Sequence, residues 1–406
     1  MFNERIIAME RVKIFAKTVE DEAALQIEKM SKCDAYKDCT IRVMPDCHAG
    51  KGCTIGTVIE LKDKVVPNTV GVDIGCGMLV ACFGKIDVDL KKLDDVINEF
   101  VPSGFRIHEK PIEQMPDLLF MKAKEIIDID NDYRSIGTLG GGNHFIEANV
   151  DKEGRFYIVI HSGSRNLGVR VCEYYQEKGL MAACIASSEK HDKKREELIK
   201  KLKEEGRQND IQNELRKLVK PKIDGELASI DYKWIEDYMN DMVIAQRYAA
   251  LNREVIMRTI CTKMDIKMFD MFHTVHNYID NSMNRLTVRK GAVRAMRGER
   301  LIIPMNMRDG SLICVGKGNP DWLYSAPHGA GRLMSRKKAF QTLDVEQFKS
   351  EMKDVYSTSV CPETLDESPM VYKPMQEIID CIEPTVEVLD VIKPVYNFKA
   401  KETRKF

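Results

Sequence analysis

Residues 71–77 read GVDIGCG and place a carboxylate, Asp73, three residues before a thiol, Cys76, within a glycine-rich turn. A β-branched pair precedes the turn and the apolar run MLVACF follows it, which predicts a turn leading into a buried strand. Glycine permits positive φ angles and close approach of other groups, so both reactive side chains could face one cation. The alternative is a tight turn with an inert buried cysteine, and this stretch alone favours that alternative.

The composition is that of an ordinary globular protein. The chain has 406 residues, 44% of them hydrophobic and 31% charged, which is enough for a large core. The formal net charge of −1 means that a polyanion would have to bind a local patch. Charges interrupt every apolar run and the N-terminus lacks a signal-peptide core, so we expect a cytoplasmic protein with no membrane partner. The 12 cysteines include no CxxC pair and are expected to be free thiols.

Strand and helix patterns are mixed without a strict βαβ period, which predicts a compact α+β fold with mixed sheets. We expect residues 1–406 to form one domain with a helical insertion at about 169–267. Within that insertion, residues 187–220, which include His191, are dense in charge and predict an exposed helical hairpin without chemistry. The further expected elements are strands within 11–17, 40–61, 64–84, 135–150, 155–168, 301–319 and 385–400, and helices at 18–32, 88–101, 112–129 and after the glycine loop of 325–339.

Three histidines occupy polar, turn-like contexts, namely His144 in GGGNHF, His161 in IHSGSR and His276 in VHNY. His161 follows the apolar strand pattern FYIVI, and residues that enter a loop from a strand often carry chemistry. Imidazole with thiolate suits zinc or iron, and a carboxylate admits manganese. Each histidine alone is more often structural, but the three with Asp73 and Cys76 favour a metal site. A thiolate shared by two ions would hold them about 3.5–4 Å apart.

A further histidine, His328, lies in the motif PHGAGR, ahead of a basic helix pattern. Histidine can form covalent intermediates, and the backbone N–H groups of a glycine loop before a helix suit phosphate oxygens. Arg165 and Arg332 could each form a forked contact with a phosphate. A glycine-rich helix entrance with a capping role is the alternative, because HGAG alone is a weak signal.

Together these motifs resemble the RtcB family of RNA ligases, and the chain is identified as a divergent, bacterial-type member. Seven motifs occur in the family's order and span most of the chain, which is far more specific than any one of them. They are MPDCHAGKG (44–52), GVDIGCG (71–77), GGGNHFIE (140–147), HSGSR (161–165), HN (276–277), RKGAVRA (289–295) and HGAGR (328–332).

The resemblance implies a catalytic domain that joins RNA 3′-phosphate or 2′,3′-cyclic phosphate ends to 5′-hydroxyl ends, in tRNA splicing or RNA repair. It implies GTP and two Mn²⁺ ions as cofactors, with GMP carried first by His328 and then by the RNA end, and it leaves an activating protein partner open. The implied metal ligands are Asp73, Cys76, His144, His161 and His276, with Cys76 between the ions. The implied GTP-binding residues are Asn143, His144, Phe145, Glu147, His276, Asn277, Pro304, Met307, Ser311, His328, Gly329, Ala330, Gly331 and Lys399, and the implied RNA contacts are Arg165 and Arg332.

Two departures from the family pattern bear on these expectations. The chain reads PMNMRDG at 304–310 where many members have PGSMG, so Met305 stands at a glycine position, where a side chain can forbid positive φ or crowd the nucleotide. Val288 replaces the family's histidine before RKGA. We expect the basic run 285–300 to attract RNA locally.

Two other functions stay open from the sequence. One is a metal-dependent 2′,3′-cyclic phosphoesterase, which intact His328 and Lys399 disfavour because hydrolysis needs neither nucleotidylation nor guanine recognition. The other is a non-catalytic RNA-end binder, which would have no need of all five ligand residues.

Overall fold

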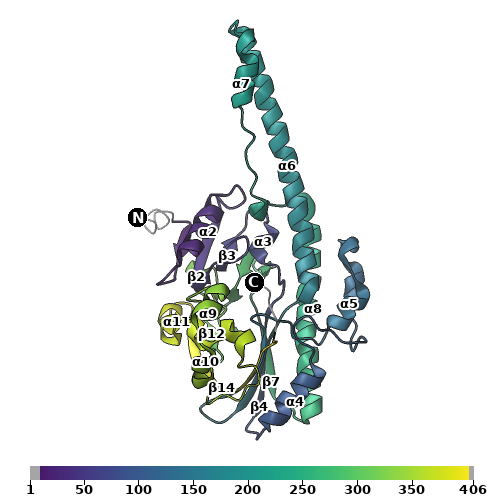
Figure 1. The fold of residues 1–406 in the computed structure, drawn as a ribbon, viewed down its shortest axis with the longest axis vertical. Helices are drawn as coiled ribbons and strands as arrows, with labels where there is room; N and C mark the ends of the chain where they lie inside the picture. Colours follow the sequence, from purple (N-terminus) through teal and green to yellow (C-terminus); the bar gives the residue numbers. More distant parts are fainter. Residues whose placement is uncertain (1–9, 402–406) are drawn as a thin grey trace.

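A long helical arm projects from a body of β-sheets in the computed structural model, which describes residues 10–401 (Figure 1). The helices are α2 (Asp21–Lys32), α3 (Pro67–Val70), α4 (Leu90–Phe100), α5 (Ile129–Ser135), α6 (Arg165–Glu204), α7 (Ile211–Lys217), α8 (Tyr232–Met264), α9 (Arg336–Thr342), α10 (Val345–Glu351) and α11 (Met375–Ile382). The strands are β1 (Val12–Ile14), β2 (Thr40–His48), β3 (Ile55–Glu60), β4 (Gly77–Gly84), β5 (Phe145–Val150), β6 (Phe156–Ser162), β7 (Asp270–Val275), β8 (Asn277–Asp280), β9 (Thr287–Lys290), β10 (Ala292–Arg294), β11 (Arg300–Asn306), β12 (Gly310–Gly316), β13 (Ser325–Pro327) and β14 (Val386–Phe398).

The largest sheet is antiparallel throughout, in the order β11-β12-β14-β5-β6-β4-β7. Its two edge strands, β11 and β7, lie close together: the Ile302 amide donates to Thr274 Oγ1 at 3.3 Å, and Arg300 forms an ion pair with Asp270. The sheet is therefore nearly closed. A second sheet runs β1-β2-β3-β9-β8, and β10 pairs with β13. This mixture of sheets and helices confirms the predicted α+β fold.

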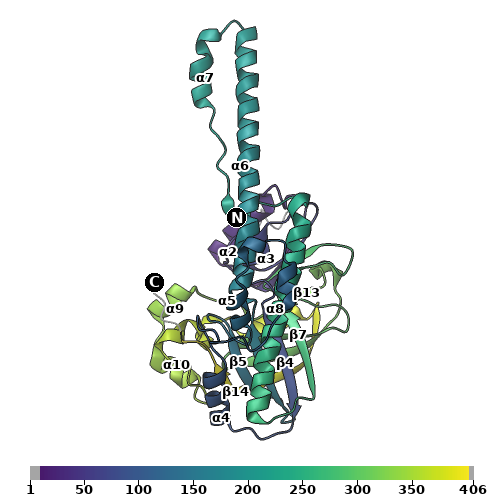
Figure 2. The same cartoon turned by 90° about the vertical axis from the view of Figure 1, so that its right-hand side faces the viewer.

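Alternation along β4 places its side chains on the two faces of the large sheet. Leu79 faces the core cluster in which Ile256 and Ile260 of α8 pack against β6 and α4, whereas Met78 and Val80 face the cluster inside the curved sheet. Helix α8 therefore covers the outer face of the sheet, with the body-side half of α6 next to it (Figure 2). Because apolar residues fill the middles of these strands, polar side chains occur at the strand ends next to glycine turns.

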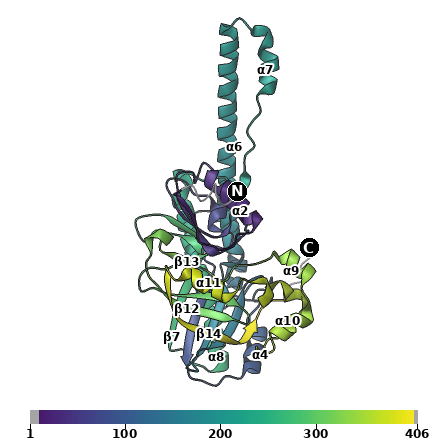
Figure 3. The same cartoon turned by 90° about the vertical axis from the view of Figure 1, so that its left-hand side faces the viewer.

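The distal part of α6 leaves the body, and α7 lies alongside it (Figure 1, Figure 3). Most side chains of this arm, residues 184–218, are exposed, and Leu202 is its buried exception. The hairpin is closed on itself at its base, where Lys220 Nζ donates to Ser188 Oγ at 2.7 Å, and His191 Nε2 lies 3.4 Å from the Leu218 carbonyl. The exposed charged hairpin expected at 187–220 is confirmed. That the chain forms one domain stays a prediction.

Two predicted helices differ from the structure. The helix predicted over 112–129 is wrong: two 3-10 turns, at Pro116–Phe120 and Lys124–Ile126, precede α5, since a proline removes a donor and restricts the residue before it. Helix α2 begins at Asp21 rather than near Thr18. None of the helices within residues 10–401 combines the length and the apolar character that a membrane span requires.

The basic helix predicted after the glycine loop is present as α9, but the loop at 329–331 does not lead directly into it. Helix α9 begins five residues later, where Ser335 Oγ accepts a hydrogen bond from the Lys338 amide at 3.3 Å. Gly331 has a φ of +75°, and a Cβ there would lie 2.3 Å from the carbonyl oxygen of Asp46. The loop is therefore a separate turn packed onto β2.

Candidate metal centre and nucleotide pocket

Cys76, immediately before β4, lies between two histidines that other strands position. Its Sγ is 3.3 Å from Nε2 of His144 and 3.3 Å from Nε2 of His161. Strand β6 pairs with both β4 and β5, and His161 of β6 stands opposite Met78 and Phe145 in their registers. The strand register alone therefore brings together three residues that are far apart in the sequence.

Asp73 and His276 extend this cluster at its two ends. Asp73 Oδ2 is 3.0 Å from His144 Nε2, and His276 Nε2 is 3.4 Å from His161 Nε2. The donor atoms form two sets, Asp73–Cys76–His144 and Cys76–His161–His276, and within each set they lie within 4.8 Å of one another. Cys76 belongs to both sets. All five residues that the sequence predicts as ligands therefore meet at one place.

Glycines make this close packing of the ligands possible. Gly75 has a φ of +75°, which turns the chain between Asp73 and Cys76. A Cβ on Gly77 would lie 2.3 Å from the Thr274 carbonyl oxygen, and one on Gly163 would lie 2.1 Å from Asp73 Oδ1. A side chain at any of the three would displace the segments that hold the cluster.

Burial governs the protonation of the cluster. It lowers the pKa of both His161 and His276 well below the ordinary value, so their imidazoles are neutral. Burial and the neighbouring Asp73 raise the pKa of the Cys76 thiol. Burial opposes ionisation of Asp73, but its interactions with His144, Cys76 and Arg165 together outweigh burial and lower the pKa. Neutral imidazole is the form that binds metals, and a bound cation would displace the thiol proton.

The donor chemistry fits a pair of transition-metal ions. One sulfur, three imidazole nitrogens and a carboxylate form a set that suits manganese, iron or zinc better than magnesium or calcium, which prefer oxygen ligands. A single thiol shared by two ligand sets is the arrangement expected where one sulfur bridges two ions.

His328 stands next to this cluster and is fixed by an acid that the sequence-based prediction left out of the site. Its ring centroid is 4.8 Å from that of His276. Its Nδ1 is 2.6 Å from Oδ2 of the buried Asp46, and the same oxygen accepts the backbone N–H groups of His328 at 3.0 Å and of Gly329 at 3.2 Å. Because Nδ1 donates to the carboxylate, the lone pair is on Nε2. The only sequence signal for Asp46 was its place in the motif MPDCHAGKG.

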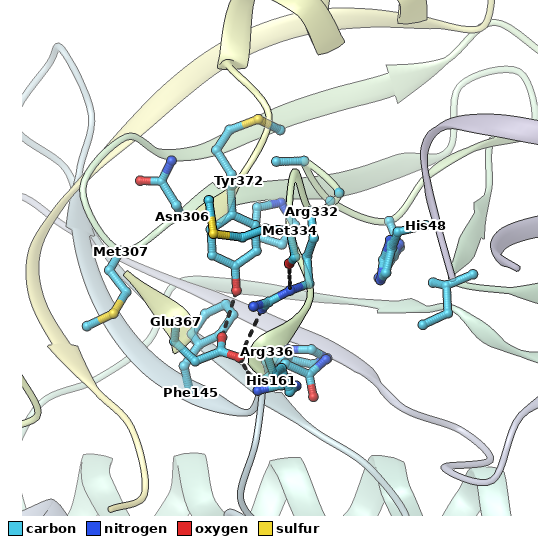
Figure 4. Close-up of a pocket in the computed structure, with 18 of the residues that line it drawn as sticks. His48, Phe145, His161, Asn306, Met307, Arg332, Met334, Arg336, Glu367 and Tyr372 are labelled. Atoms are coloured by element: carbon cyan, nitrogen blue, oxygen red, sulfur yellow. Dashed lines mark hydrogen bonds and ion pairs between the residues drawn. The ribbon is translucent and has the colours of Figure 1, made fainter. Parts of the chain in front are cut away.

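A cavity of about 620 Å³ has His328 in its lining. Figure 4 shows other residues of its wall, among them His161 and Arg332. His161 contributes to its wall, so the cavity adjoins the metal cluster. The cavity lining includes most of the residues predicted for GTP and one of the two predicted for RNA: Asn143, Phe145, Glu147, Pro304, Met307, His328, Gly329, Ala330, Gly331, Arg332 and Lys399.

Glu367 organises the part of the cavity near Lys399. Its carboxylate accepts hydrogen bonds from Lys399 Nζ at 3.0 Å, Tyr372 Oη at 2.7 Å and Arg336 NH1 at 2.6 Å, and Figure 4 shows this carboxylate between the tyrosine and arginine side chains. Burial alone would raise its pKa, but Lys399 and the two nearby arginines outweigh burial and hold the pKa well below its usual range. No sequence motif marked Glu367, Tyr372 or Arg336, because their proximity arises only in the fold.

Glu147 is the second buried acid of the cavity. It is 3% exposed, and Asn397 Nδ2 donates to Glu147 Oε2 at 2.7 Å. Burial raises the pKa of Glu147 to about 7. Lys399 also lies over the Phe145 ring, 5.3 Å from its centroid.

Four residues predicted for GTP are not in the cavity lining, namely His144, His276, Asn277 and Ser311. Asn277 instead supports the metal-ligand segments, since its Nδ2 donates to the Asp73 carbonyl at 3.2 Å and its Oδ1 accepts from the Gly291 amide at 3.0 Å. Ser311 is fully buried in β12 opposite Pro304.

The two arginines predicted for RNA occupy different settings. Arg332 lines the cavity, and its NH2 donates to the Asp366 carbonyl at 2.7 Å. Arg165 lies outside the lining, with Nε donating to Thr138 Oγ1 at 3.0 Å and NH2 donating to the Gly104 carbonyl at 2.6 Å. Arg165 also has a φ of +56°, a left-handed conformation that is uncommon for a residue with a side chain.

Two sequence-based expectations about this region change. Met305 keeps a negative φ and packs in the core with Ala330, so its side chain does not strain the turn, although crowding of a nucleotide stays a prediction. Much of the charge of the run 285–300 is paired, since Arg289 is buried against Asp280 at 2.6 Å, and attraction of RNA by this run stays a prediction. Other basic residues of the run form the ion pairs Arg285–Glu60, Arg294–Glu299 and Arg300–Asp270, and Lys290 donates a hydrogen bond to the Asn68 carbonyl.

Fold and site together define a mixed α+β protein with a candidate two-metal cluster beside a histidine-bearing cavity. The family model described as "tRNA-splicing ligase RtcB" matches residues 26–128 and 121–400, and the chain belongs to the RtcB family. It is similar to the RNA-splicing ligase RtcB of Escherichia coli K12, with 30% identity across 88% of this chain and 90% of the relative. It is also similar to the tRNA-splicing ligase RtcB of Aeropyrum pernix, with 27% identity across 90% of this chain and 88% of the relative.

Proposed function

We propose that this chain is an RNA ligase that joins RNA 3′-phosphate or 2′,3′-cyclic phosphate ends to 5′-hydroxyl ends, using GTP and two Mn²⁺ ions. The observation that carries the proposal is that Cys76 belongs to two ligand sets directly beside His328. A histidine whose ring centroid lies 4.8 Å from that of the proposed ligand His276 is suited to phosphoryl transfer at a two-metal centre. Membership of the RtcB family supports the same reaction.

In the first step His328 takes GMP from GTP. Its Nε2 lone pair forms a bond to the α-phosphorus, the bond from that phosphorus to the bridging oxygen of the β-phosphate breaks, and pyrophosphate leaves. Asp46 accepts the hydrogen bond from Nδ1 at 2.6 Å, which orients the ring and leaves Nε2 as the attacking nitrogen. Asp73, Cys76, His144, His161 and His276 would hold the ions. The bound ions would act as Lewis acids that stabilise the charge on the phosphate oxygens.

The chemistry of the cavity suits a guanine base. Guanine presents N–H donors on one edge and O6 and N7 acceptors on the other. Glu147 would accept from the donor edge, and the Lys399 ammonium would donate to the acceptor edge. Phe145 supplies an apolar ring to the same wall.

In the second step an oxygen of the RNA 3′-phosphate attacks the phosphorus of the GMP adduct, and the bond from that phosphorus to Nε2 of His328 breaks. In the third step the 5′-hydroxyl oxygen attacks the RNA 3′-phosphorus and loses its proton, and GMP leaves as the new phosphodiester forms. A cyclic phosphate has first to be opened by water to the 3′-phosphate. Arg332 in the cavity wall and Arg165 beside the metal cluster would hold RNA phosphates. We propose that the enzyme acts in the cytoplasm, as one catalytic domain with the helical arm as its insertion.

The test is incubation of the full chain with α-labelled GTP and Mn²⁺, followed by denaturing separation and acid treatment. We expect a labelled, acid-labile protein band, as for a phosphoramidate on histidine. His328→Ala should lose the band while keeping its bound metal, and the matched control His191→Ala, on the arm, should keep the label. An unchanged adduct in His328→Ala would remove the assigned nucleophile. An unlabelled wild-type protein that still opens cyclic phosphates would point to the phosphoesterase function instead.

A further inference from the structure

Helix α8 carries two adjacent, fully buried polar residues behind the metal cluster, Asn252 and Arg253. Neither belongs to the ligand sets or to the cavity lining. Most other inward-facing residues of this part of α8 are apolar, including Val255, Ile256 and Ile260. Two polar side chains in a row at such a position have to be explained by what they bond.

Arg253 links the two segments that carry Cys76 and His161. Its NH1 donates to the Gly75 carbonyl at 2.9 Å and to the Ser162 carbonyl at 2.8 Å. Gly75 immediately precedes Cys76, and Ser162 immediately follows His161. One guanidinium nitrogen therefore bridges the backbones beside two ligands whose side chains are 3.3 Å apart.

Asn252 links the same strand end to the segment that leads toward His144. Its Oδ1 accepts the amides of Gly137 at 2.8 Å and Thr138 at 3.0 Å. Its Nδ2 donates to Ser162 Oγ at 3.0 Å and to the Gly163 carbonyl at 3.2 Å. Gly163 is the glycine whose missing side chain makes room for Asp73, so Asn252 also fixes that space.

The cost of burying Arg253 shows that these bonds matter. Its Nε and NH2 are buried and have no hydrogen-bond partner among the described residues. A buried, incompletely paired cation destabilises a fold, and an apolar side chain of similar volume would avoid the cost. The bonds to Gly75 and Ser162 are therefore what an arginine supplies at this position and an apolar residue could not.

We propose that Asn252 and Arg253 are positioning residues of the metal centre, which hold the turn before Cys76, the end of β6 and the 137–138 segment at the spacing that lets Cys76 serve both ligand sets. This proposal rests on the proposed metal centre. Residues that orient metal ligands through hydrogen bonds commonly affect metal affinity about 10- to 100-fold when they are removed.

Cobalt binding to the full chain tests the proposal without relying on RNA joining. Co²⁺ is a suitable probe because thiolate-to-cobalt charge transfer reports coordination by Cys76. We expect two Co²⁺ per chain and a charge-transfer band for the wild type. Arg253→Met and Asn252→Ala should each raise the dissociation constant of at least one ion about tenfold or more and weaken the band. Arg253→Lys, which keeps the charge, should lie between the wild type and Arg253→Met.

Tyr248→Phe is the matched control on the same helix. The Tyr248 hydroxyl is buried and donates to the Asp132 carbonyl at 2.5 Å, away from the ligand segments. This variant should lower the melting temperature of the metal-free protein and leave both Co²⁺ sites and the band unchanged. It separates loss of a buried hydrogen bond in α8 from loss of ligand positioning.

The results distinguish failure of the positioning role from failure of the proposed function. Variants of Asn252 and Arg253 that unfold cooperatively yet bind two Co²⁺ with wild-type affinity and spectrum would overturn the positioning role. If Arg253→Met lacks a cooperative transition, Arg253→Lys and Asn252→Ala decide by the same criterion. A wild-type chain that binds no Co²⁺ and forms no GMP adduct would overturn the proposed function itself.

Discussion

Replacing Glu147 by glutamine should make the fold more stable above neutral pH while it impairs nucleotide use. Burial raises the pKa of Glu147 to about 7 from an ordinary value of 4.5. The pKa of this acid is higher in the folded protein than in the unfolded chain, so the protonated carboxyl group contributes its full stabilisation of the fold below pH 4.5. That contribution is lost as the pH rises to about 7, because the unfolded chain gives up the proton first. At about 1.4 kcal/mol per pH unit, the interval corresponds to about 3 kcal/mol. Glutamine keeps the shape and the hydrogen bond with Asn397 but cannot ionise.

Urea unfolding of the wild type and Glu147→Gln at pH 5 and pH 8, followed by tryptophan fluorescence, measures this difference. The advantage of the variant in unfolding free energy should grow by about 2–3 kcal/mol between the two pH values. Glu153→Gln, on an exposed turn, is the matched control and should show no such growth. Adduct formation from GTP should fall about 10- to 100-fold in Glu147→Gln, because a charged hydrogen-bond acceptor is lost. Parallel pH profiles for the wild type and Glu147→Gln would refute the buried-carboxylate reasoning.

Three further changes test other parts of the site. Cys76→Ala should reduce bound Mn²⁺ below two per chain, as measured by elemental analysis. Cys172→Ala, which removes another buried thiol, should leave the bound Mn²⁺ unchanged. Full occupancy in Cys76→Ala would show that Cys76 is a core residue and not a ligand. Asp46→Asn should slow single-turnover adduct formation about a hundredfold or more, since it no longer fixes the His328 tautomer, and an unchanged rate would contradict that role. Replacing the arm, residues 184–218, by a short linker should shift Tm by less than about 2 °C in calorimetry, because its few buried contacts are its own; a large decrease would show that the arm supports the body.

The metal cluster could be predicted because its residues mark strand ends. Cys76 and His144 each come just before a strand, His161 lies near the end of one, and His276 lies between two. Such positions are visible in the sequence as glycine-rich or polar breaks beside apolar runs, and antiparallel pairing brings them to one edge. Their roles as ligands stay predictions, although their proximity is confirmed.

The supporting residues could not be predicted, because their function depends on long-range packing. Asn252 and Arg253 lie in the middle of a helical pattern, and in the sequence they cannot be distinguished from its other polar positions. Glu367 belongs to a segment with no motif, and its partners come from distant parts of the chain. The acidic partners of the basic run 285–300 could not be predicted for the same reason, since the sequence shows the cations but not the acids that pair with them.

The projecting arm has a consequence for how the molecule behaves in solution. Helix α6 has 40 residues and is therefore about 60 Å long at 1.5 Å per residue, and its outer half extends beyond the body (Figure 1). A particle of this shape experiences more friction than a sphere of equal mass and diffuses more slowly. Gel filtration calibrated with spherical standards will therefore overestimate the mass of a monomer, whereas light scattering will report it correctly.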